Sequence, residues 1–172
     1  MIGNFKPCLE FVLKHEGGWA DHPRDPGGAT MKGVTLKVYR EYLGRNASKE
    51  ELRNIPEQHL VEIYKSLYWD KANCDGFLAG VDLVVFDMAV NSGVSRSARI
   101  LQRCVGAVPD GIIGPITMDL VNGIPAKDII IKFSDGRENF YKSLSTFDTF
   151  GRGWLRRTEE CEEKALTMIG DK

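Results

Sequence analysis

The sequence predicts a mostly α-helical fold, because apolar residues recur at helical spacing along most of its 172 residues. Capping residues, glycines and prolines mark where these helical segments begin and end. No convincing alternation of apolar and polar residues predicts a long strand, and at most a small β-hairpin is expected within residues 18–35. The hydrophobic fraction of 42% and the charged fraction of 27% are those of a globular protein with a substantial core.

The predicted helices follow one another with short connections. The first carries its apolar residues on one stripe up to Val12 and ends at Gly17, because glycine allows the left-handed backbone that stops a helix. A short helix is expected from Ser48, which forms a capping-box pattern with Glu51. The further helices are expected over residues 36–43, 56–67, 81–90, 95–105, 125–145 and 154–169, with another beginning at Pro115.

A glutamate, Glu16, follows the first helix on its apolar side, four residues after Val12. We therefore expect its carboxyl group to face the protein body at the last helical turn. The negative end of the helix dipole and partial burial both favour the protonated form of a carboxyl group at such a place. An acid that keeps its proton near neutral pH is what cleavage of a glycosidic bond requires. Glu16 is the first candidate for a catalytic acid.

Two further polar residues follow in the turn after Glu16. Asp25 comes after eight intervening residues and Thr30 after four more, with Pro-Gly-Gly directly after Asp25. The proline disfavours helix before it and the glycines allow a tight bend, so both side chains could return toward Glu16. There they would stabilise positive charge on a sugar or hold the attacking water. The simpler interpretation is a common turn, in which Thr30 caps the segment that follows.

The residues of this stretch resemble the signature of glycoside hydrolase family 108. The resemblance is carried by Glu-Gly-Gly-Trp at residues 16–19, Asp-Pro-Gly-Gly-Ala-Thr at 25–30 and Gly-Val-Thr at 33–35. Members of that family are N-acetylmuramidases of bacteriophage endolysins and bacterial muramidases linked to secretion or toxin release. The resemblance implies a lysozyme-like helical fold with Glu16 as the catalytic acid. The order Glu, Asp, Thr also resembles the triad of phage-type lysozymes, many of which have one more residue between Asp and Thr.

Similar patches of the family lie at residues 68–70, 87–93 and 150–154. Three aromatic residues, Trp19, Tyr68 and Trp69, are candidates for stacking on the apolar faces of sugar rings. Trp19 is the first of these because it flanks Glu16. Aromatic residues at helical spacing more often belong to the core, and that interpretation stays open for each of the three.

Two polar residues interrupt the predicted helix at residues 81–90, which is otherwise apolar on nearly all sides and therefore buried. Asp87 and Asn91 are four residues apart and lie on one face of that helix. Buried polar groups need hydrogen-bond partners. The pair either lines the sugar cleft near Glu16, or it holds the turn around Asp25 or caps a neighbouring helix.

The chain divides by sequence into a catalytic region, residues 1–93, and a helical region resembling a peptidoglycan-binding module, residues 94–172. Residues 110–117 resemble the Asp-Gly-x-x-Gly-x-x-Thr core of peptidoglycan-binding repeats, although a turn before a helix at Pro115 explains them as well. Arg152, Arg156 and Arg157 form a basic cluster around Trp154, for which a solvated helix face is the simpler interpretation. No flexible linker separates the two regions, so we expect them to pack into one unit.

Composition excludes several classes of protein. The net charge of −1 gives no attraction to nucleic acid or anionic membranes, and no run of about 18 apolar residues predicts a membrane span. No secretory signal is visible, so we expect synthesis in the cytoplasm and action on the wall after release. The four cysteines and three histidines have no metal-binding spacing, so we expect no metal or other cofactor and mostly buried, reduced thiols. We expect a monomer.

The predicted function is hydrolysis of the β-1,4 bond between N-acetylmuramic acid and N-acetylglucosamine in peptidoglycan glycan strands. Glu16 would protonate the leaving oxygen, with Asp25 and Thr30 assisting water or the transition state. A lytic transglycosylase or a chitinase would use a similar acid. In a different class of protein, a non-catalytic wall-binding or secretion-accessory module, Glu16 would be structural.

Overall fold

The computed structural model describes residues 3–23 and 28–169, which fold mostly into helices as the sequence predicts. The chain forms two units, Leu9–Leu67, and Met1–Cys8 together with Tyr68–Lys172. This division differs from the predicted one between residues 93 and 94. The reason is that the apolar helix at residues 81–92 packs against helices that follow it in the chain.

The smaller unit contains the end of the first helix, a sheet and three further helices. Its elements are α1 (Phe5–His15, which begins in the other unit), β1 (Trp19–Ala20), β2 (Thr30–Met31), β3 (Val34–Thr35), α2 (Leu36–Leu43), α3 (Lys49–Arg53) and α4 (Glu57–Tyr64). The Thr35 hydroxyl caps α2 by accepting a hydrogen bond from the amide of Val38. The capping box of Ser48 and Glu51 at the start of α3 is confirmed.

The sheet of the smaller unit has three antiparallel strands in the order β1-β2-β3, one strand more than the hairpin the sequence predicts. Strands β2 and β3 are joined by two residues, Lys32 and Gly33, whose φ angles are 48° and 82°. Two successive positive φ angles in a two-residue loop define a turn whose twist matches that of the strands beside it. The turn therefore holds the backbone of Gly33 in a fixed position at its tip.

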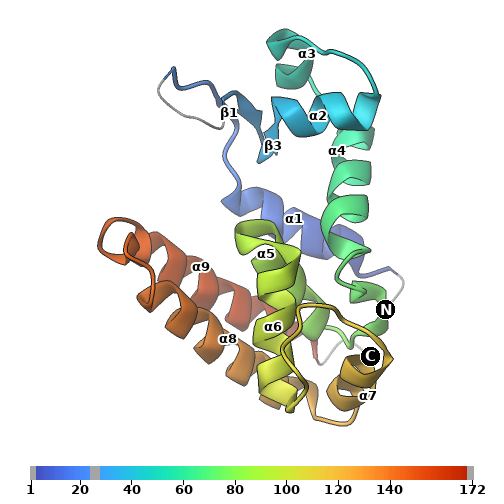
Figure 1. Cartoon of the computed structure of the whole chain (residues 1–172), viewed down its shortest axis with the longest axis vertical. Helices are drawn as coiled ribbons and strands as arrows, with labels where there is room; N and C mark the ends of the chain where they lie inside the picture. Colours follow the sequence, from blue (N-terminus) through green and yellow to red (C-terminus); the bar gives the residue numbers. More distant parts are fainter. Residues whose placement is uncertain (1–2, 24–27, 170–172) are drawn as a thin grey trace. The chain divides into compact units, whose positions relative to one another are not determined.

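The larger unit is helical. Its elements are the end of η1 (Lys65–Trp69, a π-helix that continues α4 and begins in the smaller unit), η2 (Cys74–Gly76), α5 (Val81–Ser92), α6 (Val94–Val105), α7 (Pro115–Asn122), α8 (Ala126–Lys142) and α9 (Phe147–Met168). Helix α9 begins seven residues before the predicted start at Trp154. Figure 1 shows α8 and α9 side by side, and α5 contacts α6, α8 and α9.

Helix α5 is the centre of this unit, because every residue from Val81 to Ala89 is buried. Beside it, the rings of Phe5, Trp69 and Phe86 meet edge to face, with Trp69 5.3 Å from each of the other two. Such edge-to-face pairs are favourable beyond the area that they bury. The free thiols of Cys8, Cys74 and Cys161 are also buried, as expected.

The loop before α7 contains the residues that resemble the core of peptidoglycan-binding repeats, and these residues have a structural role. The buried side chain of Gln102 in α6 donates hydrogen bonds to the Asp110 carboxylate at 2.8 Å and to the Thr117 hydroxyl at 3.2 Å. Its carbonyl oxygen accepts from the amide of Gly111 at 2.9 Å. The Asp-Gly and Thr positions therefore fasten this loop to α6.

Candidate active site

Glu16 follows the last turn of α1, as the sequence predicts. Its amide donates to the carbonyl of Val12 at 3.1 Å, which continues the helical hydrogen bonds by one residue. Val12 and Leu9 are buried, whereas Glu16 is half-buried. The apolar stripe of α1 therefore anchors the helix and leaves the carboxylate at the edge of the core.

The carboxylate of Glu16 lies against Gly33, at the tip of the turn between β2 and β3. A methyl group on Gly33 would stand 2.9 Å from Oε2 of Glu16 and 2.5 Å from the hydroxyl oxygen of Tyr64. Both distances are shorter than side-chain carbons tolerate, and the positive φ angle also disfavours any residue but glycine. Because Gly33 has no side chain, the Glu16 carboxylate and the Tyr64 hydroxyl can both lie close to it.

Tyr64 fastens this turn. Its side chain is 1% exposed, and its hydroxyl donates to the carbonyl oxygen of Lys32 at 2.6 Å. On the other side of the turn, the amide of Lys32 donates to the carbonyl oxygen of Gly18 at 3.2 Å. The turn is thus tied both to α4 and to the loop that carries Glu16, which favours a fixed position for the carboxylate.

Tyr64 is not among the residues that the sequence predicts for the site. Its hydroxyl comes from α4, and the acid is 48 residues earlier in the chain. The available signal was the Gly-Val-Thr part of the family signature, because a glycine kept beside a catalytic motif indicates a close approach by another group.

An open cleft of about 430 Å³ lies beside Glu16. Its lining residues come from α1, the loop that follows it and the turn: Glu10, Leu13, Lys14, Glu16, Gly17, Gly18 and Lys32. The volume lies in the range of sites that hold small ligands. Glu10 is a second carboxylate at this cleft and was not predicted from the sequence. It lies three and four residues before Leu13 and Lys14, a spacing that places all three side chains on one face of α1.

The other predicted residues of the smaller unit have different positions. Asp25 lies outside the described residues. Thr30 is half-buried in β2, where it pairs with Ala20 on one side and Thr35 on the other. Trp19 is half-buried in β1, and the guanidinium of Arg53 lies 5.7 Å from its ring centre. The structure therefore places Thr30 in the sheet whose turn contacts Glu16.

The predicted aromatic candidates of the larger unit lie in η1. Tyr68 is half-buried. Trp69 has no exposed surface, and its indole nitrogen donates to the Asp75 carboxylate at 2.8 Å. Stacking on a sugar is therefore excluded for Trp69 in this structure, because its ring faces are occupied by the aromatic cluster around α5.

Asp87 is fully buried and forms ion pairs, so it has no surface for a sugar. Its carboxylate is 2.7 Å from Nη1 of Arg137 and 2.8 Å from Nη2 of Arg157. The Tyr141 hydroxyl receives a hydrogen bond from Nε of Arg137 at 3.0 Å and donates one to the half-buried Asn91 side chain at 2.5 Å. Asp87 and Asn91 thus belong to one network inside the larger unit.

The two arginines determine the charge of Asp87. Burial by itself would raise the pKa of this carboxyl, but Arg137 and Arg157 outweigh that effect and hold its pKa below the usual range. Asp87 is therefore ionised in the folded protein. Among residues 3–23 and 28–169, no group of three or more His, Cys, Asp or Glu side chains is arranged to hold a metal ion.

Comparison with known proteins identifies the family of this chain. The family model of glycosyl hydrolase 108 matches residues 9–93. The solved structure of Brucella abortus SagA is 38% identical, with a TM-score of 0.88, over 98% of this chain and 97% of that chain. No curated protein matches the sequence. Across the described parts of the chain, no helix has the length and apolar character of a membrane span. The chain belongs to the glycosyl hydrolase 108 family, has a lysozyme-like fold and is a peptidoglycan hydrolase.

Proposed function

We propose that this protein is an N-acetylmuramidase, which hydrolyses the β-1,4 bond between N-acetylmuramic acid and N-acetylglucosamine. The observation that carries the proposal is the placement of Glu16. Its carboxyl group stands at an open cleft and against a glycine turn that Tyr64 fastens. A single positioned acid beside a cleft is what protonation of a glycosidic oxygen requires.

In the proposed reaction, Glu16 gives its proton to the oxygen that leaves the muramic acid ring. Positive charge then develops on the ring, and a water attacks the anomeric carbon. Asp25 and Thr30 are proposed to stabilise that charge or to orient the water. Tyr64 and Gly33 are proposed to act through Glu16, by fixing where its carboxyl group lies.

The experiment compares Glu16→Gln with Glu57→Gln, a matched change of an exposed glutamate in α4 that does not line the cleft. The amide keeps the shape of the side chain but has no proton to give, so Glu16→Gln should lower lysis of purified sacculi by about 100- to 10 000-fold. Glu57→Gln should retain the activity of the unchanged protein. Both variants should keep the melting temperature of the unchanged protein.

Mass spectrometry of the digested sacculi identifies the bond. Reducing N-acetylmuramic acid ends support the proposal. Anhydro ends would show a lytic transglycosylase, and cleavage of unsubstituted chitin with intact sacculi would show a chitinase. Normal lysis by a folded Glu16→Gln protein would show that Glu16 is not the catalytic acid.

A further inference from the structure

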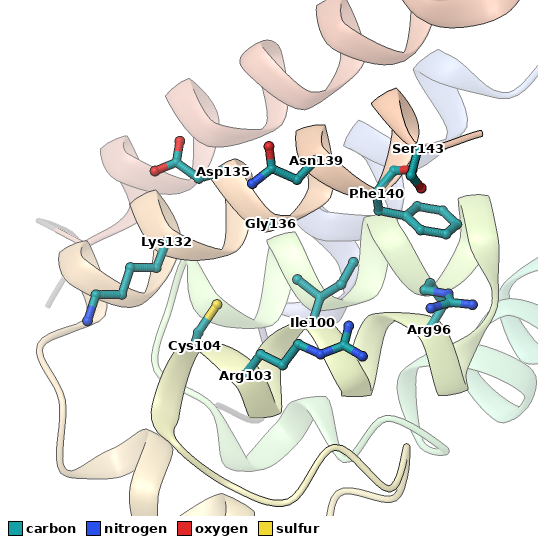
Figure 2. Close-up of a pocket in the computed structure, with 10 residues that line it drawn as sticks. All are labelled: Arg96, Ile100, Arg103, Cys104, Lys132, Asp135, Gly136, Asn139, Phe140 and Ser143. Atoms are coloured by element: carbon teal, nitrogen blue, oxygen red, sulfur yellow. The ribbon is translucent and has the colours of Figure 1, made fainter. Parts of the chain in front are cut away.

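Helices α6 and α8 of the larger unit enclose a groove of about 700 Å³, which is larger than the cleft beside Glu16. Figure 2 shows side chains of both helices along it. The volume suits a drug-sized molecule or a short peptide. Nothing in the proposed reaction uses this groove.

The floor of the groove depends on a glycine inside α8. Gly136 has Ile100 of α6 opposite it, and a methyl group on Gly136 would stand 3.1 Å from Cγ2 of Ile100. Glycine within a helix costs about 0.5–1 kcal/mol relative to alanine. Here it lets the two helices approach closely while the space above the contact stays open.

Positive charge predominates along the groove. Arg96 and Arg103 line it from α6 and Lys132 from α8, whereas Asp135 is the one carboxylate among its lining residues. In the described part of the chain, no carboxylate forms an ion pair with any of these three cationic groups. The groove therefore presents unneutralised positive charge, which attracts a ligand carrying carboxylates.

The charges are spread along the length of the groove. Figure 2 shows Lys132 at one end and Arg96 at the other. The guanidinium of Arg96 lies 4.6 Å from the ring centre of Phe140, a cation–π contact that holds this charge at the rim. Positive groups at both ends match a ligand with more than one carboxylate.

The space between these ends is suited to a peptide. Ile100 and Phe140 provide apolar surface for small side chains such as methyl groups, and the exposed amide of Asn139 offers both a donor and an acceptor to peptide groups. Asp135 can accept a hydrogen bond from a side-chain amine. A neutral sugar chain would leave the cationic groups without partners.

We propose that the groove between α6 and α8 binds the peptide stems of peptidoglycan, through their free carboxylates, and not the glycan strand. The stems are short, they carry several carboxylates, and they contain small apolar residues and an amine. The choice of this peptide rests on the proposed function, since a peptidoglycan hydrolase meets it on its own substrate. The charge and the size of the groove are the observations that indicate a short ligand with several carboxylates.

The test uses calorimetric titration of the whole protein with a soluble stem tetrapeptide that has free carboxylates. The double variant Arg103→Glu with Lys132→Glu should bind it at least about tenfold more weakly, because two charge-assisted contacts become repulsive. Lys127→Glu, on the same helix but outside the groove, is the matched control and should bind normally. The same tetrapeptide with amidated carboxylates should also bind at least about tenfold more weakly.

Equal binding of the free and amidated tetrapeptides, or unchanged binding by the folded double variant, would overturn the proposal. So would a peptide-free glycan that displaces the tetrapeptide. The proposed function is tested separately, by hydrolysis of peptide-free glycan strands. Loss of that hydrolysis in Glu16→Gln together with normal tetrapeptide binding supports both proposals, whereas undiminished hydrolysis with normal binding would overturn only the catalytic one.

Discussion

Replacing Asp87 with asparagine should destabilise the larger unit strongly. The carboxylate of Asp87 is the partner of both Arg137 and Arg157, which are 1% and 9% exposed. The change keeps the size of the side chain but removes the negative charge that both buried guanidinium groups contact. Removing one partner of a buried ion pair costs about 3–5 kcal/mol.

The expected loss of unfolding free energy corresponds to a large fall in melting temperature. Domains of this size lose about 2–4 °C in melting temperature per kcal/mol, so Asp87→Asn should melt about 6 to 20 °C lower. The measurement is thermal unfolding followed by circular dichroism and by calorimetry. Asp82→Asn is a control in the same buried helix, where the carboxylate accepts hydrogen bonds from the Asn4 amide and from the backbone amides of Gly80 and Leu83.

The pH dependence should differ between these two residues. The depressed pKa of Asp87 means that its contribution is present above the pKa of an unfolded aspartate and is lost as the pH falls through the lower, folded value. Burial raises the pKa of Asp82, so its contribution is present below the unfolded pKa and is lost as the pH rises through the folded value. Acid titration of the melting temperature should therefore show a steeper loss for the unchanged protein than for Asp87→Asn.

A compensating variant separates the loss of a partner from the loss of packing. Replacing the three charged residues together, as Asp87→Leu with Arg137→Met and Arg157→Met, removes the unpaired charges and should recover most of the stability. The reasoning would be refuted by an Asp87→Asn protein that melts within about 2 °C of the original. A triple variant as unstable as Asp87→Asn would show that packing, and not charge, causes the loss.

The remaining predictions concern the position of the acid. Gly33→Ala should lower turnover by about 100-fold with little change in KM, because a shift of about 1 Å at the carboxyl group has an effect of that size; normal kinetics would show that the contact with Glu16 has no role. Tyr64→Phe leaves the carbonyl of Lys32 without its donor, so it should lower stability by about 1–3 kcal/mol and also lower kcat, both measured on the purified protein. Asp25→Ala should reduce turnover strongly and Thr30→Ala mildly, with small changes in melting temperature; lower melting with normal turnover would instead identify both as turn residues.

Much of the local structure follows from residues close together in the chain. The capping box at Ser48 and the start of α7 at Pro115 are confirmed, because each depends on contacts within about one helical turn. The position of Glu16 at the end of α1 follows from the apolar spacing before it. The burial of α5 follows from its composition alone, since a helix that is apolar on every side needs partners all round.

The partners of these elements were decided by tertiary structure. Arg157 was expected on a solvated surface with its neighbours in sequence, yet it pairs with Asp87, 70 residues away. Trp69 was a candidate for sugar stacking and is a core residue. Tyr64 was not predicted as a site residue, yet its hydroxyl holds the turn beside Glu16. Helical periodicity predicts which face of a helix is buried, but not which distant group meets it there. That pairing arises only when folding brings separated segments together. The place of Glu16 at the end of α1 could therefore be predicted from the sequence, whereas the residues that contact it from other segments could not.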